Sequence, residues 1–145
     1  MDASGENLSL KRIKVLIAKL GLDTHWRGAI TVAHILKNAG MDVLYLGNSM
    51  PEDIIEAVID EDPQVVGLSS LGGAHLSLGE KVLELAKTHN LHNTKVYVIG
   101  GVIPPDDEQK LLKIGYDLVF GANATEQEII NGIKNKLSEK GLLTI

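Results

Sequence analysis

Short apolar runs rich in β-branched residues alternate along the chain with segments of helical period, and this alternation limits the folds available to it. Strict alternation of this kind is typical of βαβ units and a parallel sheet. The runs are almost entirely apolar, as expected for strands that helices cover on both faces. We therefore predict a flavodoxin-like (Rossmann-like) α/β fold, doubly wound around a five-stranded parallel sheet with strand order 2-1-3-4-5. The predicted strands are 13–18, 42–47, 64–70, 95–101 and 117–121.

Some of the predicted helices carry capping signals at their ends. Gly40 follows the first helix in the position of a C-cap glycine. Ser49 is the expected N-cap of the second helix, and Pro51 lies in its first turn. Thr125 opens the last helix with Glu128 three residues on, which is the spacing of a capping box. The helices are predicted at about 27–39, from Ser49 onward, and at about 76–88, 105–114 and 125–137.

Length and composition narrow the class of protein. A chain of 145 residues fits one domain, which we expect at 11–138 between tails at 1–10 and 139–145. The net charge of −5, without a block of basic residues, argues against a nucleic-acid partner. No apolar stretch is long enough to span a bilayer and no leader pattern is present, so we predict a cytoplasmic protein without a membrane partner. The absence of cysteine excludes thiol catalysis and leaves imidazole or carboxylate as ligands for any metal.

The predicted fold also predicts where a ligand binds. In an open α/β sheet, ligands bind beyond the carboxyl ends of the strands, at the point where the strand order reverses. Here that point lies between the first and third strands. No G-x-G-x-x-G or P-loop pattern is present there. Ser69 and Ser70 end the third strand where a receiver domain needs an aspartate, and the aromatic residues that a flavodoxin needs around its flavin are missing. The loops at this edge are 19–27, 71–76, 100–105 and 121–125.

The stretch GLDTHWRG after the first strand holds the most suggestive polar pair. Asp23 and His25 are two residues apart, so the carboxylate could fix the imidazole tautomer and leave the other ring nitrogen for a ligand. Lys19 could extend this relay. Alternatively, Asp23 caps the following helix and His25 is a solvated loop residue. The spacing alone leaves both interpretations open.

Three motifs together resemble a known family. DTHWRG matches the Asp-x-His-x-x-Gly motif of cobalamin-binding domains, SSL at 69–71 matches their Ser-x-Leu, and the glycine pair at 100–101 matches their Gly-Gly. The resemblance covers about residues 11–137. It is strongest to the cobalamin-binding region, or small subunit, of acyl-CoA mutases of the methylmalonyl-CoA mutase type. The stretches KLGLDTHWRGA, VVGLSSLGGAHLSL and GGVIPPDDEQKLLKIGYDLVFG carry it.

The resemblance implies roles for particular residues. Cobalamin binds with its dimethylbenzimidazole tail pulled off the cobalt and threaded into the domain. His25 is then the lower axial cobalt ligand, Asp23 accepts a hydrogen bond from its other nitrogen, and Lys19 lies behind Asp23. Gly28 allows a tight turn beside the tail, and the Gly-Gly pair leaves room for it. The implied cofactor-binding residues are Asp23, His25, Trp26, Arg27, Gly28, Ser69, Leu71, His75, Gly100 and Gly101.

The resemblance also implies a reaction and a partner. The cofactor is adenosylcobalamin, and the reaction is a radical rearrangement of the carbon skeleton of an acyl-CoA. No part of the chain resembles the (β/α)₈ barrel that binds the CoA ester, so a large subunit supplies it. This chain then has no catalytic residue of its own and is inactive alone. The loop 121–125 departs from the mutase pattern toward corrinoid carriers of methyltransferase systems, which are the alternative. A non-catalytic cobalamin-binding module is a third possibility.

Overall fold

The computed structural model describes residues 13–20, 27–70, 76–121 and 123–142. It contains one five-stranded sheet in the order β2-β1-β3-β4-β5, and every neighbouring pair of strands is parallel. The predicted fold and strand order are confirmed. The elements are β1 (Lys14–Leu20), α2 (Arg27–Asn38), β2 (Asp42–Ser49), α3 (Pro51–Glu61), β3 (Val65–Ser70), α4 (Ser77–Thr88), β4 (Val96–Gly101), α5 (Pro105–Ile114), β5 (Leu118–Phe120) and α6 (Glu126–Glu139).

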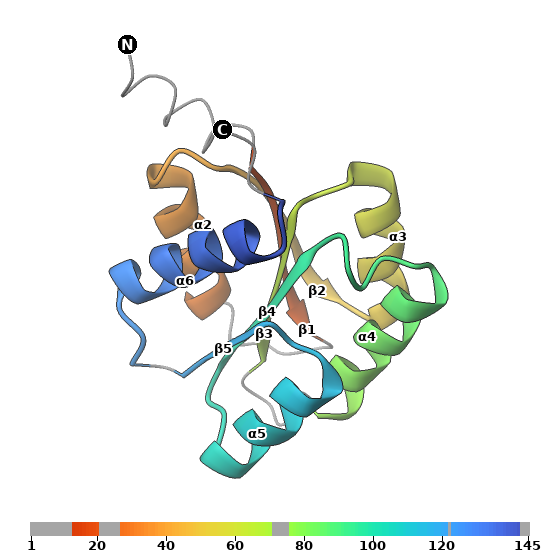
Figure 1. Cartoon of the computed structure of the whole chain (residues 1–145). Coiled ribbons are helices and arrows are strands. Elements are labelled where there is room, and N and C mark those ends of the chain that lie inside the picture. The colour runs from red at the N-terminus through yellow and green to blue at the C-terminus, as the bar shows by residue number, and fades with distance from the viewer. Residues whose placement is uncertain (1–12, 21–26, 71–75, 122, 143–145) are drawn as a thin grey trace.

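The helices form two layers, one on each side of the sheet (Figure 1). Successive side chains of a strand point to opposite faces. On one face, Leu16 of β1 and Ile99 of β4 pack in a cluster with residues of α3, α4 and α5. On the other face, Val15 of β1 and Val98 of β4 pack in a cluster with residues of α2 and α6. We call these the α3–α5 face and the α2–α6 face.

Strand β2 forms one edge of the sheet and differs from the prediction. It runs on to Ser49, and its register against β1 shifts between Ile17 and Ala18. Ser49 is therefore a strand residue, and its hydroxyl donates to the carbonyl of Gly47 (3.2 Å). The predicted N-cap at Ser49 is wrong. The N-cap of α3 is Met50, because Pro51 occupies the first helical position and favours an extended residue directly before it.

The predicted capping box of α6 is confirmed. The backbone N–H of Glu128 donates to Thr125 Oγ1 (3.1 Å), and the backbone N–H of Thr125 donates to Glu128 Oε1 (2.9 Å). This second bond stabilises the carboxylate and holds the pKa of Glu128 below its ordinary value. Gly40, after α2, has a φ of 100°, which agrees with its predicted capping position.

The other end of α6 is tied to the amino end of the sheet. Lys140 Nζ donates to the carbonyl of Lys95 (2.6 Å) and pairs with Asp117 (3.2 Å). Asp117 also accepts the backbone N–H of Tyr97 (2.8 Å), and Leu142 packs against the cluster on the α2–α6 face. The domain boundary at residue 138 stays a prediction, although these two residues beyond it contact the domain.

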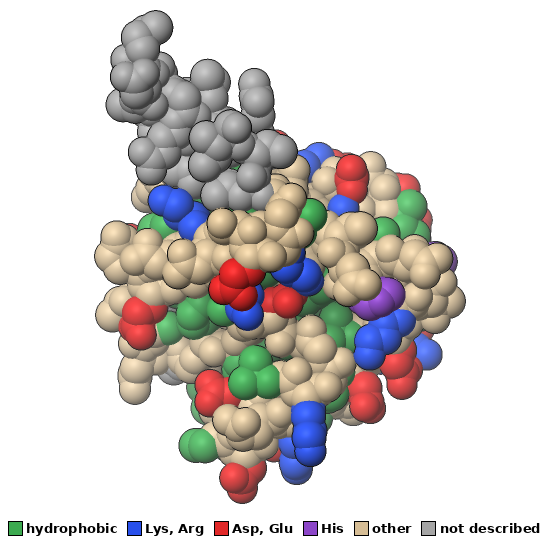
Figure 2. Space-filling model, in the orientation of Figure 1, with side chains coloured by type: hydrophobic (Ala, Val, Ile, Leu, Met, Phe, Trp, Pro, Cys, Tyr) green, Lys and Arg blue, Asp and Glu red, His purple; other side chains and the backbone are tan. Residues whose placement is uncertain are grey.

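Charged side chains of both signs lie interspersed over the face shown in Figure 2 rather than gathered in blocks. A search of the helices in the described ranges finds none with the length and apolarity that a membrane span requires.

Candidate functional site

A cavity of about 400 Å³ lies between the sheet and the helices of the α2–α6 face. This volume is within the usual range for a small-molecule pocket. Strands β1, β3 and β4 contribute its floor, and the point where the strand order reverses lies between β1 and β3. The walls come from both helices, with Phe120 at the end of β5. The apolar side chains that line it are Ile17, Ala29, Val32, Ile35, Leu36, Val65, Val98, Phe120, Ala124, Ile129 and Ile133.

Two glycines on neighbouring strands keep the floor of the cavity low. Gly67 of β3 is paired with Val98, and Gly100 of β4 is paired with Ser69. A Cβ at Gly67 would lie 2.7 Å from Ile17 Cδ1, and one at Gly100 would lie 3.2 Å from the carbonyl oxygen of Phe120. Because neither position has a side chain, space remains above the sheet that larger residues would fill.

Gly101 is required for a different reason from the one that the resemblance to cobalamin-binding domains implies. It has a φ of +135°, and a Cβ there would lie 2.1 Å from the carbonyl oxygen of Ser70. The approach of the backbone of β3 therefore excludes a side chain at Gly101, whether or not a ligand is bound. Gly101 still lines the cavity, so its room for a tail stays a prediction.

Several predicted site residues meet at the carboxyl ends of the strands. Lys19, at the end of β1, is only 3% exposed and is in register with Ser69 of β3. Ser69 Oγ lies 3.9 Å from where a Cβ of Gly28 would be, so the first turn of α2 passes close to it. The structure thus brings Lys19, Gly28, Ser69 and Gly100 to one end of the cavity face. Asp23, His25, Trp26, Leu71 and His75 lie outside the described residues, and Arg27 is the first residue of α2.

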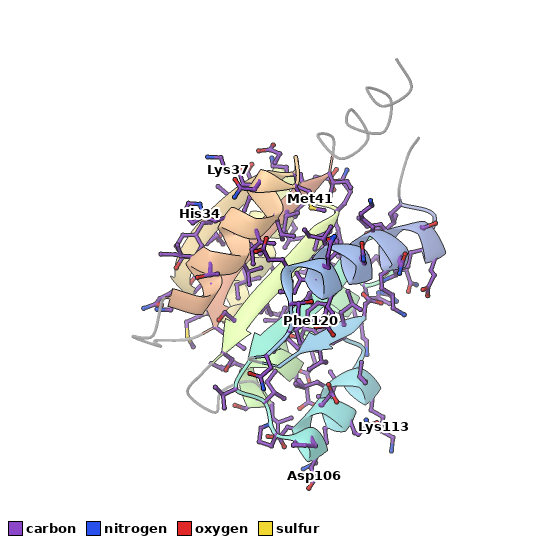
Figure 3. The ribbon with its side chains drawn as sticks, turned by 90° about the vertical axis from the view of Figure 1, so that its left-hand side faces the viewer. His34, Lys37, Met41, Asp106, Lys113 and Phe120 are labelled. Atoms are coloured by element: carbon purple, nitrogen blue, oxygen red, sulfur yellow. The ribbon has the colours of Figure 1, made fainter. Side chains whose placement is uncertain are left out.

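The histidines that are described lie away from this edge. His34 is exposed on the outer side of α2, near Lys37, as Figure 3 shows. His89 follows α4, and His92 lies in the turn before β4. Within the described part of the chain, no group of three or more His, Cys, Asp or Glu side chains could hold a metal ion.

The sequence analysis did not single out three residues that shape the cavity. Gly67 lies inside a predicted strand, and an isolated glycine in such an apolar run signals a close approach or a missing side chain. Phe120 is the only phenylalanine of the chain. Gly132 of α6 lies against its ring, because a Cβ there would be 3.0 Å from Phe120 Cζ. Nothing in the sequence pattern links these three positions.

Comparison with known proteins agrees with this geometry. The model of the B12-binding domain matches residues 13–130. The chain belongs to the B12-binding domain family. This B12-binding domain is 36% identical over 130 residues to the 2-hydroxyisobutanoyl-CoA mutase small subunit of Aquincola tertiaricarbonis, which covers 89% of this chain and 95% of that subunit.

The domain is also similar to a methylmalonyl-CoA mutase and to a cobalamin-binding protein of known structure. It is 35% identical over 130 residues to methylmalonyl-CoA mutase of Escherichia coli, covering 89% of this chain but 18% of that enzyme. The crystal structure of a cobalamin-binding protein from Desulfitobacterium hafniense superimposes with a TM-score of 0.72 at 26% identity, covering 88% of this chain and 59% of that one. The predicted resemblance to cobalamin-binding domains and to acyl-CoA mutase small subunits is confirmed.

Proposed function

We propose that this B12-binding domain is the cofactor-binding subunit of an adenosylcobalamin-dependent acyl-CoA mutase. The observation that carries the proposal is the cavity on the α2–α6 face, with a floor lowered by Gly67 and Gly100 at the ligand-binding edge of the sheet. The similarity of the domain to a mutase small subunit, along nearly the whole of both chains, supports the same role. A separate large subunit then binds the acyl-CoA, and this chain alone is inactive. A cytoplasmic location stays a prediction.

The residues present fit a cobalamin whose nucleotide tail has left the cobalt. The cavity offers an apolar slot for the tail base, and its glycine floor gives the slot depth. Ser69 stands at the carboxyl end of this slot, beside the first turn of α2. The backbone N–H groups of that turn have no partner within the helix, so they suit the phosphate of the tail. Leu71 would add an apolar contact to the tail.

The cobalt ligand comes from the loop between β1 and α2. His25 would bind the cobalt, and Asp23 would accept a hydrogen bond from the other imidazole nitrogen, which would fix the tautomer and the ring orientation. Lys19 is buried at the end of β1 and would give Asp23 a cationic neighbour. Trp26, Arg27 and His75 would contact the corrin or its side chains. When bound, the cofactor supplies homolysis of its cobalt–carbon bond, which starts the rearrangement of the acyl-CoA.

A spectroscopic titration tests the cobalt ligand directly. The purified chain is titrated with cobalamin, and the visible spectrum is compared between the parent and His25→Ala. We expect a base-off, histidine-ligated spectrum in the parent and its loss in the variant. His34→Ala is the matched control, since His34 is exposed on α2, and it leaves the spectrum unchanged. A parent-like spectrum in His25→Ala would show that another group binds the cobalt.

Asp23→Asn tests the hydrogen bond to the ligand. This variant keeps the shape of the side chain but removes its charge, so we expect weaker or misoriented histidine ligation without loss of folding. Losses of about 10- to 100-fold in affinity are usual when such a partner of a metal ligand is removed. Unchanged affinity and spectrum would exclude this role for Asp23.

The loop 121–125 favours a second candidate, a corrinoid carrier that passes methyl groups between transferases. The two functions separate in one experiment. With a large mutase subunit, the chain carrying adenosylcobalamin converts an acyl-CoA to its isomer. As a carrier, it instead exchanges a methyl group with a methyltransferase and shows no isomerase activity with any large subunit.

A further inference from the structure

The cavity on the α2–α6 face has a polar end and an apolar end. The residues that line it are spread along the length of the strands and of the helices α2 and α6. At the carboxyl end of the strands stand Ser69, Gly28 and Gly121. Toward the amino end, the lining consists of Leu36, Val65 and Ile133.

The apolar end offers no side-chain hydrogen-bonding group among the described residues. Of all the described side chains that line the cavity, only those of Thr31 and Ser69 carry a polar atom. Leu36, Val65 and Ile133 are each at most 2% exposed. The backbone groups of the strands and helices around them are already engaged in regular hydrogen bonds. A ligand group that needs a hydrogen bond finds no side-chain partner at this end among the residues that the structure describes.

We propose that the cavity selects corrinoids by the base of their nucleotide tail, and that it favours an apolar benzimidazole over a purine. This inference rests on the proposed function, in which the tail enters the cavity. Dimethylbenzimidazole presents methyl groups to the aliphatic end and gains from their burial. Adenine carries an exocyclic amine and additional ring nitrogens, which are hydrogen-bonded in water and lose those partners at this end.

Phe120 and Gly132 set the width of the cavity. The ring of Phe120 is one of its walls, and Figure 3 shows this residue below α6 at the end of β5. The ring can lie against α6 because position 132 has no side chain, and a Cβ there would be 3.0 Å from Cζ. A methyl group at position 132 pushes the ring away from the helix, and the cavity is the free space beside it. Gly132 is thus a specificity-determining position that touches no ligand itself.

The test compares three corrinoids on the full chain. Dissociation constants are measured from the corrin absorbance for cobalamin, for the cobamide with adenine in place of dimethylbenzimidazole, and for cobinamide, which has no nucleotide. We expect the adenine cobamide to bind at least about tenfold more weakly than cobalamin, since one unsatisfied buried polar group accounts for that factor. Val98→Thr adds a hydroxyl to the cavity wall and should bring the dissociation constants of the adenine cobamide and of cobalamin closer together.

A matched pair of variants tests the role of Gly132. Gly132→Ala weakens the binding of cobalamin several-fold and leaves that of cobinamide unchanged, because only cobalamin uses the cavity. Gly79→Ala is the control: it adds the same methyl group to a helix, against Tyr116 Oη (3.3 Å), but on the α3–α5 face. It changes the binding of neither corrinoid.

The outcomes distinguish this inference from the proposed function. Equal affinities for cobalamin and the adenine cobamide overturn the selection by the tail base but leave cobalamin binding intact. Equal affinities for cobalamin and cobinamide show that the tail does not use the cavity. Failure of the parent chain to bind any of the three overturns the proposed function together with the inference. The comparison of ligands on the parent decides the matter even if a variant does not fold.

Discussion

The two faces of the sheet use the same apolar residue types but fill space differently. On the α3–α5 face, Leu16, Leu68 and Ile99 stand between the strands and the helices and are almost completely buried. On the α2–α6 face, the strand positions Gly67 and Gly100 carry no side chain, and a cavity lies above them. The difference lies in volume rather than polarity. It suggests that one face of this domain provides stability while the other holds space for a ligand.

The largest expected effect comes from removing equivalent side chains on the two faces. Ile54→Ala, in α3, should lower the free energy of unfolding by about 4 kcal/mol, because Ile54 is fully packed. Ile133→Ala, in α6, should cost about 2 kcal/mol, since one side of Ile133 already borders the cavity and makes fewer contacts. Both variants gain the same helix propensity, so urea denaturation compares packing alone. Equal losses would mean that the two faces are packed alike.

Ligand binding should reduce the contrast between the faces. At 100 times its dissociation constant, cobalamin should raise the free energy of unfolding by about 2.7 kcal/mol. Because the cavity lies on the α2–α6 face, amide exchange should slow most in α2 and α6 and least in α3 and α4. Hydrogen-exchange mass spectrometry with and without cobalamin measures this pattern. Uniform slowing over both faces would contradict it.

The contacts of Asp117 with Lys140 and with the Tyr97 backbone tie the end of α6 to the amino end of the sheet. Removing them tests whether α6 needs these contacts in addition to its packing over the cavity. Asp117→Ala removes the acceptor of the Tyr97 backbone N–H and the partner of Lys140, so unfolding should become easier by about 2 kcal/mol. Lys136→Ala is the control, because it breaks only the exposed pair with Glu139 and should change stability by less than about 0.5 kcal/mol. Chemical denaturation of both variants checks this. Similar small losses in the free energy of unfolding for both variants would show that the Asp117 contacts do not stabilise the protein.

The smallest expected effect concerns the other end of α6 and depends on pH. The pKa of Glu128 is lowered in the folded protein by hydrogen bonds with Thr125. Its contribution to stability is therefore present above the unfolded pKa of about 4.3 and is lost as the pH falls through the lower folded value. Glu128→Gln should flatten the dependence of the melting temperature on pH below about pH 5. A slope identical to that of the parent would exclude this contribution.

Most of the fold could be predicted from the sequence because local patterns and topology agree. The apolar runs predicted all five strands, and their alternation with helices predicted a doubly wound sheet and thus the order in which the strands pair. The N-cap of α3 was misplaced because Ser49 has the favoured residue type, while the constraint from Pro51 acts one residue later. The cavity could not be predicted. It depends on Gly67 of β3 and Phe120 of β5, and only the register of the sheet brings both of them to its lining.

The site was predicted less completely for a related reason. The motifs identified Ser69 and Gly100, which do line the cavity, because family resemblance is read from contiguous letters. Gly132 was not identified, since its role is to make room for the ring of Phe120, which comes from β5. The roles of His25 and Asp23 remain predictions that the proposed titrations test.

The two kinds of glycine in this sheet should have different evolutionary fates. Gly101 faces the carbonyl of Ser70, so the polypeptide itself forbids replacement there. The close contact of a Cβ at Gly67 would be with the flexible tip of Ile17, so the fold tolerates a small side chain once nothing needs the space. Homologues that no longer bind cobalamin should therefore keep Gly101 and lose Gly67. A substitution at position 67 in an otherwise ordinary descendant would mark a lineage that has given up its cofactor.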